Sequence, residues 1–333
     1  MPDAAHRPRI AVLGAGAWGT ALAVQAARAG HAATLWGRDA ARVAEIAQAR
    51  ENARYLPGVK LSAAITPTDD LGAAARGAVL LLAAVPAQHL RAVLERLPPD
   101  AAAPIVVCAK GVEQGTLRLP LEVVEEVRPG GPGAVLSGPN FAHEIARGLP
   151  AAAVCAGRDA ALRDRIGVLL GSPGFRIYGN DDPMGVQVGG AAKNVIAIAA
   201  GAVIGAGLGE NARAALVTRG LAELSRLTVA LGGRPETAAG LSGLGDLLLT
   251  TTGPGSRNTH LGNDLGRGRS LEEALAATVG VAEGVATAPA IVARAREIGV
   301  ELPICGAVAD LLAGEMTVGD AMMRLLARPR RDE

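Results

Sequence analysis

The sequence of 333 residues is poor in aromatic residues and in cysteine, and neither sign of charge dominates it. Its three cysteines lie far apart, so neither a disulfide framework nor a cysteine-rich metal site is expected. A formal net charge of +1 offers no electrostatic basis for binding nucleic acid or an anionic membrane surface. We therefore expect a protein of a reducing, cytoplasmic environment, with no nucleic-acid partner and no stable membrane insertion.

Long apolar runs and histidines are also scarce. The longest apolar run, at residues 195–209, contains several glycines and falls short of the roughly 20 residues that a transmembrane helix needs. We predict that it is a buried helix. The five histidines show no metal-ligand spacing among themselves or with cysteine, so no metal site is predicted and a zinc-dependent dehydrogenase is disfavoured.

A glycine-rich turn follows the first apolar run. Residues 14–19 form the pattern G-x-G-x-x-G between a predicted strand and a predicted helix. Gly14 would permit the tight turn, Gly16 would let phosphate groups approach bare backbone, and Gly19 would allow close packing of helix and strand. The segment also resembles the apolar region of a secretory signal peptide, but glycines weaken such a helix and a second predicted strand follows. We therefore predict a dinucleotide pyrophosphate at this helix N-terminus.

Strands and helices alternate in the first part of the chain. Short apolar or β-branched runs occur at residues 10–13, 32–36, 78–85, 105–108, 134–136, 151–155 and 176–178. Separated by helical patterns, they predict a mostly parallel sheet with helices on both faces. After about residue 183 long helical patterns take over. We expect an α/β protein with a Rossmann-type doubly wound domain over residues 1–185 and an all-α domain over residues 186–333.

The carboxyl ends of these strands are the expected ligand side of the sheet. They lie near Val85, near Lys110 and at residues 137–140. The ammonium of Lys110 can therefore reach a cofactor or a substrate, although a surface lysine at a strand end is equally ordinary. His143 lies near the same crevice, but a surface helix would explain it equally well.

Lys193 is the only charged residue between positions 183 and 209. Burial of a lysine disfavours its charged form and lowers its pKa, which makes Lys193 a candidate general acid or base. The alternative is a side chain that extends to solvent along a helix edge. Asn194 beside it either orients a substrate oxygen or caps a turn.

Two later segments carry further candidates. Asp246 follows a glycine-rich stretch and is either a helix N-cap, a ligand of a substrate hydroxyl, or a partner of Lys193. Residues 253–258 form a glycine-rich loop that ends in Ser256, Arg257 and Asn258. Such a loop suits a phosphate monoester through backbone N–H groups and a guanidinium, and its alternative is a flexible loop with an N-cap serine.

Taken together, these segments resemble bacterial NAD(P)-dependent glycerol-3-phosphate dehydrogenases over essentially the full chain. The matching blocks are GAGAWGTALA at 14–23, LWGRD at 35–39, AKG at 109–111, SGPNFAHE at 137–144, GGAAKNVIAIAAG at 189–201, NARAALVTRGLAE at 211–223, GLGDLLLT at 243–250 and SRN at 256–258. The resemblance implies reversible reduction of dihydroxyacetone phosphate to sn-glycerol 3-phosphate with NADPH or NADH, for phospholipid synthesis. A homodimer is plausible from this likeness alone.

The resemblance also implies roles for individual residues. Lys193 matches the proton-transfer lysine, Lys110 the second lysine at the reacting end, and Asp246 the carboxylate near Lys193. The expected substrate residues are Lys110, Gly138, Asn140, Lys193, Asn194, Asp246, Ser256, Arg257 and Asn258. The expected cofactor residues are Gly14, Gly16, Ala17, Trp18, Gly19, Arg38, Tyr55, Lys110, Ala142, Arg257, Val281 and Glu283.

Two positions bear on specificity. Relatives often carry a hydroxyl residue where this chain has Asn140, and either side chain can hydrogen-bond to a substrate. An NAD-selective site would show Asp or Glu at the end of the second strand, whereas Arg38 offers positive charge for a 2′-phosphate. We therefore predict that NADPH is accepted, while Asp39 keeps NADH open.

Two other functions fit parts of this pattern. A β-hydroxyacid dehydrogenase also places a lysine after a glycine on the first long helix of its second domain, but its substrate needs a carboxylate site in place of the loop 256–258. A non-catalytic dinucleotide sensor would need an effector surface such as a basic DNA-binding module, and a net charge of +1 gives no sign of one.

Overall fold

The computed structural model describes residues 8–329, which form two compact units. The first contains the chain up to Lys110 together with Leu119–Val186. The second contains Gly111–Arg118 and the chain from Gln187 onward.

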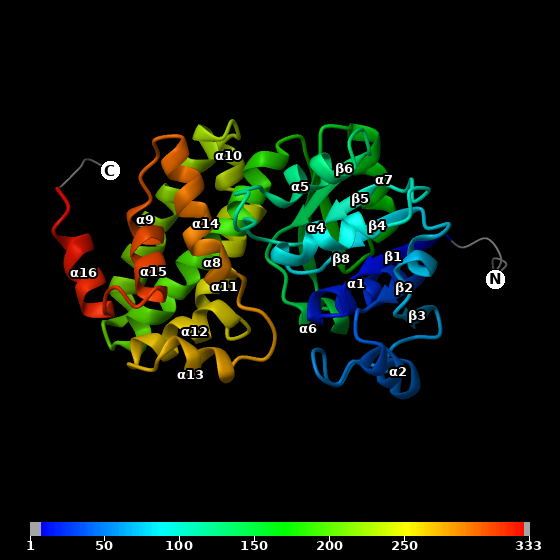
Figure 1. Ribbon diagram of the computed structural model, residues 1–333, viewed down its shortest axis with the longest axis horizontal. Helices are drawn as coiled ribbons and strands as arrows, with labels where there is room; N and C mark the ends of the chain where they lie inside the picture. Colours follow the sequence, from blue (N-terminus) through cyan, green and yellow to red (C-terminus); the bar gives the residue numbers. More distant parts are fainter. Residues whose placement is uncertain (1–7, 330–333) are drawn as a thin grey trace. The chain divides into compact units, whose positions relative to one another are not determined.

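The first unit is built around an eight-stranded sheet (Figure 1). Its strands lie in the order β3 (Ile65–Thr68), β2 (Ala32–Trp36), β1 (Arg9–Leu13), β4 (Leu80–Ala83), β5 (Ile105–Val107), β6 (Gly133–Ser137), β7 (Ala151–Ala156) and β8 (Phe175–Asn180). Only the β6–β7 pair is antiparallel among these neighbours in the described sheet. The predicted doubly wound, mostly parallel sheet is confirmed.

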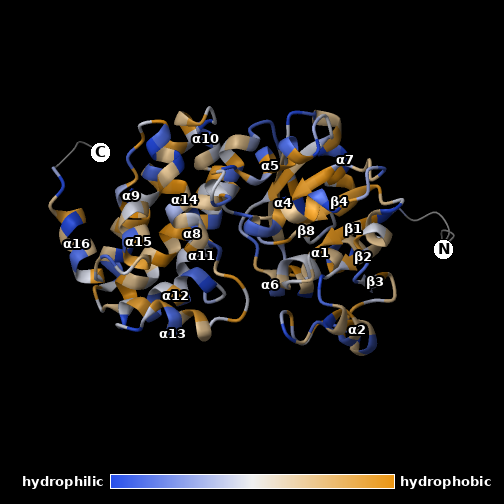
Figure 2. Cartoon of the chain, in the orientation of Figure 1, coloured by the Kyte–Doolittle hydropathy of each residue, from blue (hydrophilic) through white to orange (hydrophobic). Residues whose placement is uncertain are grey.

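Helices cover both faces because the strands bury side chains on both sides. In β1, Ile10 and Val12 join the apolar cluster on one face, whereas Ala11 and Leu13 join the cluster on the other. The first cluster is completed by α1 (Ala17–Arg28), α2 (Ala40–Ala49), α6 (Ala142–Arg147) and α7 (Ala160–Leu170). The second is completed by α3 (Leu71–Ala75), α4 (Ala87–Glu95) and α5 (Pro120–Val127). Figure 2 shows the inner strands of this unit as hydrophobic.

The sequence did not predict β3. This strand contains Pro67, which has no backbone N–H to donate to a neighbouring strand. Proline is tolerated because β3 lies at the edge of the sheet and pairs with β2 alone.

Within residues 187–329 the second unit contains helices joined by loops, and no strand. They are α8 (Pro183–Gly205, which starts in the first unit), α9 (Gly209–Ala230), α10 (Pro235–Ala238), the π-helix η2 (Leu241–Gly245), α11 (Asp246–Thr252), α12 (Arg257–Gly266), α13 (Leu271–Ala276), α14 (Glu283–Glu297), α15 (Pro303–Leu312) and α16 (Val318–Leu326). Within residues 8–329, α8 is the one helix long and apolar enough to cross a membrane, and 89% of its most apolar window is buried inside the protein. The predicted buried helix is confirmed up to residue 205, where α8 ends.

Candidate functional site

The turn after β1 has the backbone geometry that its glycines require. Gly14 has a φ of +120°, and a Cβ on it would lie 2.9 Å from backbone atoms of Ala84 and Val85. A Cβ on Gly19 would lie 1.8 Å from the Gly14 carbonyl oxygen, so α1 approaches β1 this closely only with glycine there. Gly16 differs, because no group of residues 8–329 outside its own helix and chain neighbours lies within 4 Å of the Cβ it would carry. Tightly packed backbone therefore borders an open space at Gly16.

The N-terminus of α1 is suited to an external anion. It has no side-chain cap at Gly16 and no acidic residue in its first turn. By contrast, α2, α3 and α7 are capped by Asp39, Asp70 and Asp159. The first N–H groups of α1 and the positive end of its dipole suit phosphate. The buried indole Nε1 of Trp18 has no hydrogen-bond partner among residues 8–329, so the residues present fit a dinucleotide.

Positive charge lies at the end of β2. Arg38 is exposed, and no hydrogen bond or ion pair joins it to another described residue. Asp39 caps α2 by accepting from the Arg42 N–H at 3.1 Å, and its second oxygen lies 3.3 Å from the Arg42 guanidinium. Arg42 also donates to the Tyr55 hydroxyl at 3.1 Å. The guanidinium of Arg38 is therefore available to a ligand here, beside a carboxylate that caps α2.

Lys110, Gly138 and Asn140 come together beyond the ends of β5 and β6. Nζ of Lys110 donates to the Gly138 carbonyl oxygen at 3.1 Å, and Gly138 has a φ of +128°. Asn140 donates through Nδ2 to the Ala152 carbonyl at 3.1 Å, while its buried Oδ1 has no partner among the described residues. This oxygen is therefore a buried acceptor beside Lys110 and Gly138. His143 is exposed on α6, as the surface-helix alternative requires.

Lys193 projects from α8 into a buried polar cluster. The residue is 8% exposed, and its Nζ donates to Asp246 Oδ1 at 2.9 Å and to Thr250 Oγ1 at 2.8 Å. The Thr250 hydroxyl donates in turn to the Asp246 backbone carbonyl at 2.6 Å, so its oxygen is an acceptor toward Nζ. The side chain does not extend to solvent along the helix edge. Instead, a carboxylate and a hydroxyl hold the ammonium in one place.

Asp246 meets Lys193 through the irregular helix before it. The π-helix η2 ends at Gly245, and Asp246 is the first residue of α11 rather than its N-cap. Turns of π-helix are rare and frequently occur at functional sites. A Cβ on Gly189 would lie 2.7 Å from the Ser242 carbonyl oxygen, so α8 passes directly against η2. This contact brings Lys193 beside Asp246.

Helices α8 and α12 are in direct backbone contact. A Cβ on Gly201 would lie 2.1 Å from a backbone oxygen of α12, and one on Gly262 would lie 1.9 Å from a backbone oxygen of α8. Gly205 and Gly266 make similarly close contacts, at 2.1 and 2.3 Å. The glycines within the apolar run therefore let α8 and α12 touch, which fixes the start of α12 relative to Lys193.

Asn194 and Asn258 form a buried pair across the same contact. Asn258 Nδ2 donates to Asn194 Oδ1 at 2.9 Å, and Asn258 Oδ1 accepts from the Gly284 N–H at 3.0 Å. Both residues are buried. These amides join α8, α12 and α14, so two expected substrate residues lie together but bond to each other.

The loop before α12 combines an N-cap with an exposed guanidinium. Ser256 caps α12, and its Oγ accepts from the Thr259 N–H at 3.1 Å. Arg257 follows it, and a Cβ on Gly280 would lie 2.9 Å from Arg257 Nη1. The Glu283 carboxylate is close enough to act electrostatically on the Arg257 guanidinium. The loop preceding α14, which contains the exposed Val281, therefore adjoins Arg257.

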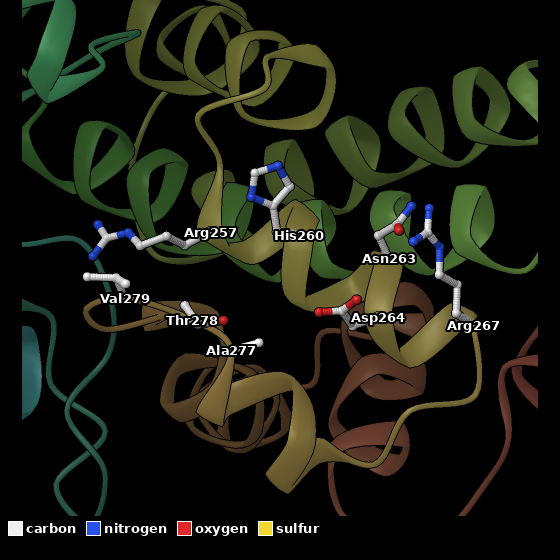
Figure 3. A pocket seen from close by; sticks show the side chains of 8 residues that line it. All are labelled: Arg257, His260, Asn263, Asp264, Arg267, Ala277, Thr278 and Val279. Atoms are coloured by element: carbon white, nitrogen blue, oxygen red, sulfur yellow. The ribbon is translucent and has the colours of Figure 1, made fainter.

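An open pocket of about 490 Å³ runs along α12 (Figure 3). Arg257 lies at one end beside Val279, and Arg267 lies at the other. Its lining consists of Arg257, His260, Asn263, Asp264, Arg267, Ala277, Thr278 and Val279. A pocket of this volume can hold a small molecule. The exposed Arg257 therefore borders a space large enough for a ligand.

One residue of these clusters was not anticipated from the sequence. Thr250 lies four residues after Asp246, a spacing that places both on one face of α11. This spacing could have identified it.

Thiol and metal chemistry have no support in the described residues. Burial raises the pKa of Cys155 to about 12 and raises that of Cys108 and Cys305 as well, so the three free thiols are poor nucleophiles. Residues 8–329 contain no cluster of three or more His, Cys, Asp or Glu residues that could hold a metal ion.

Comparisons with known proteins agree over both units. Residues 9–163 match the model for the N-terminus of NAD-dependent glycerol-3-phosphate dehydrogenase, and residues 182–323 match that for its C-terminus. The chain is 55% identical over 327 residues to glycerol-3-phosphate dehydrogenase [NAD(P)+] of Caulobacter vibrioides, covering 98% of each chain. The structure is similar to the crystal structure of glycerol-3-phosphate dehydrogenase from Coxiella burnetii, with a TM-score of 0.94. The two sequences are 39% identical, and the match covers 97% of this chain and 99% of that one.

Proposed function

The chain belongs to the NAD-dependent glycerol-3-phosphate dehydrogenase family, and we propose that Lys193 is the proton donor of its reaction. The protein reversibly reduces dihydroxyacetone phosphate to sn-glycerol 3-phosphate with NAD(P)H, and so supplies glycerol 3-phosphate for phospholipid synthesis. The observation that carries the proposal is the position of the Lys193 ammonium, buried between Asp246 and Thr250.

A bound NAD(P)H would supply the hydride for the ketone carbon, so the oxygen of that ketone needs a proton. Lys193 Nζ gives this proton to the developing alkoxide. Asp246 and Thr250 accept hydrogen bonds from Nζ and hold it in place. A positioned general acid of this kind contributes about 10² to 10⁴ in rate.

The remaining substrate residues bind the ends of the molecule. Lys110 adds a second positive charge for the developing oxyanion; it donates to the Gly138 carbonyl, and Asn140 lies next to Gly138. At the other end, Arg257 holds the phosphate as a bidentate donor, with the N-terminus of α12 at Ser256. Asn194 and Asn258 act chiefly by joining the helices that carry Lys193 and Arg257. Binding energy from the phosphate thus orients the reacting carbonyl.

The cofactor residues divide by the part of the dinucleotide they serve. Gly14, Gly16, Ala17, Trp18 and Gly19 form the pyrophosphate turn. Arg38 and Tyr55 lie at the adenosine end of the dinucleotide. The other proposed cofactor contacts are Lys110, Ala142, Arg257, Val281 and Glu283.

Arg38 makes NADPH an accepted cofactor. Its guanidinium is exposed at the end of β2, and the neighbouring Asp39 is engaged in capping α2. The Arg38→Ala variant should lose more kcat/KM with NADPH than with NADH, because only NADPH carries the 2′-phosphate. Equal losses with both cofactors would refute this assignment.

The finer organisation is also a proposal, in which the dimer comes from family likeness, the domain bounds from the change of sequence pattern and the location from the sparse cysteines. We infer a homodimer in the cytoplasm, with a dinucleotide-binding domain over residues 1–185 and a substrate-binding, catalytic domain over residues 186–333. Three free cysteines, all buried, agree with a reducing environment.

The role of Lys193 can be tested with a matched pair of lysine variants. The chain has three lysines, Lys60, Lys110 and Lys193, and the Lys60 side chain is 72% exposed. Oxidation of NADPH with dihydroxyacetone phosphate should lose about 10² to 10⁴ in kcat in Lys193→Ala. Lys60→Ala should retain wild-type kcat. Full activity of Lys193→Ala would defeat the proposal.

A further inference from the structure

Asn52 lies buried behind the glycine-rich turn, in the segment between α2 and β3. Only 1% of the residue is exposed. Its Nδ2 donates to the Ala15 carbonyl oxygen at 3.0 Å and to the Thr20 hydroxyl at 2.8 Å. A carbonyl oxygen can only accept, so the amide group of Asn52 must turn its NH₂ toward the glycine-rich turn.

Thr20 continues this network to the next peptide. Its buried hydroxyl accepts from Asn52 and donates to the Gly16 carbonyl oxygen at 2.8 Å. Asn52 and Thr20 therefore hold two successive carbonyl groups of the turn, those of Ala15 and Gly16. In a planar trans peptide the carbonyl and the following N–H point in opposite directions. Fixing these carbonyls therefore aims the N–H groups of Gly16 and Ala17 away from Asn52.

The backbone of Asn52 organises a second segment. Its carbonyl oxygen accepts from the Leu56 N–H at 2.8 Å and from the Tyr55 N–H at 3.2 Å. The turn that Asn52 begins therefore carries Tyr55, whose hydroxyl accepts from Arg42. Asn52 thus connects the glycine-rich turn to the side chains of Tyr55 and Arg42, which lie near the end of β2.

We propose that Asn52 is a positioning residue for the dinucleotide. Its side chain aims the Gly16 and Ala17 N–H groups at the pyrophosphate, and its backbone sets the position of Tyr55 at the adenosine end. This rests on the proposed cofactor site at the glycine-rich turn. Loss of the Asn52 amide leaves the Ala15 carbonyl without its donor and lets the peptide rotate. The affinity for NADPH then falls, while the chemistry at Lys193 does not depend on Asn52.

The test compares Asn52→Leu with Gln25→Leu. Gln25 of α1 is a matched control, because it is also 1% exposed. Its Nε2 donates to the Leu170 carbonyl at 2.8 Å and not to a residue of the glycine-rich turn. The Kd of NADPH is measured by isothermal titration calorimetry, and KM and kcat are measured with dihydroxyacetone phosphate. Asn52→Leu should raise the Kd and KM for NADPH roughly tenfold or more, with little change in kcat at saturation. Gln25→Leu should lower the melting temperature and leave the Kd unchanged.

A purely structural role for Asn52 gives a different pattern. Asn52→Leu would then resemble Gln25→Leu, with a lower melting temperature and a wild-type Kd for NADPH, and the proposal would be overturned. If Asn52→Leu does not fold, Thr20→Val removes the second member of the network with little change in shape. It should raise the Kd for NADPH, and a wild-type Kd would also overturn the proposal. Failure of the wild type to bind NADPH would instead contradict the proposed function.

Discussion

The substitution Gly262→Ala tests how closely α8 and α12 are packed. The added Cβ would lie 1.9 Å from the Ile198 carbonyl oxygen and 3.0 Å from the Ala202 nitrogen, so the two helices must separate. Forcing extra atoms into a packed core costs about 1–3 kcal/mol, and contact with the α8 backbone rather than with a flexible side chain puts this case at the upper end. Replacing glycine by alanine within a helix returns roughly 0.5–1 kcal/mol. The expected net destabilisation is therefore about 2 kcal/mol.

Gly167→Ala is the matched control for this substitution. Gly167 lies within α7, and a Cβ there would have no described group from outside the helix within 4 Å. The control should show only the gain in helix propensity. For units of 150–250 residues, 1 kcal/mol shifts the melting temperature by about 2–4 °C, so Gly262→Ala should melt roughly 4–8 °C lower and Gly167→Ala slightly higher. Differential scanning calorimetry measures both, and equal melting temperatures would refute direct backbone contact between α8 and α12.

Three further predictions concern charged side chains. Asp246→Asn removes the carboxylate that pairs with Lys193, so it should lower the free energy of unfolding by about 3–5 kcal/mol and reduce kcat. An unchanged midpoint of urea unfolding would contradict the buried ion pair. Lys110→Ala should reduce kcat/KM for dihydroxyacetone phosphate without lowering the melting temperature; wild-type kinetics would remove Lys110 from the reacting end. Burial raises the pKa of Glu223 above its ordinary value. Between about pH 4.3 and that raised pKa the folded protein keeps a proton on Glu223 that the unfolded chain has lost, so the free energy of unfolding falls as pH rises through this range. The Glu223→Gln variant should not show this fall when its free energy of unfolding is measured by urea denaturation across the same pH range. Parallel pH profiles for the variant and the wild type would contradict the prediction.

The glycine-rich turn could be predicted from sequence because each glycine has a local task. The pattern of Gly14, Gly16 and Gly19 between a strand and a helix depends on neighbouring residues only. Lys193 was predictable for a related reason, since a single charge within a long apolar stretch needs a partner inside the protein. Asp246 remained one of three alternatives, and the structure shows it bonded to Lys193.

Features that depend on contacts distant in the chain were not predictable in the same way. The role of Gly262 follows from the crossing of α8 and α12, which no local pattern specifies. The pairing of Asn194 with Asn258 joins residues far apart in sequence, and each alone looked like a substrate contact. Strand β3 was missed because Pro67 argues against a strand unless the edge position is known.

The central claim is that Lys193 performs proton transfer while the glycine-rich turn of the other unit binds the cofactor. It is tested most directly in Lys193→Ala by two measurements on one preparation, the Kd of NADPH and the rate of NADPH oxidation in a single turnover with saturating dihydroxyacetone phosphate. We expect a wild-type Kd together with a rate lowered by about 10² to 10⁴. A single-turnover rate equal to that of the wild type would contradict the claim.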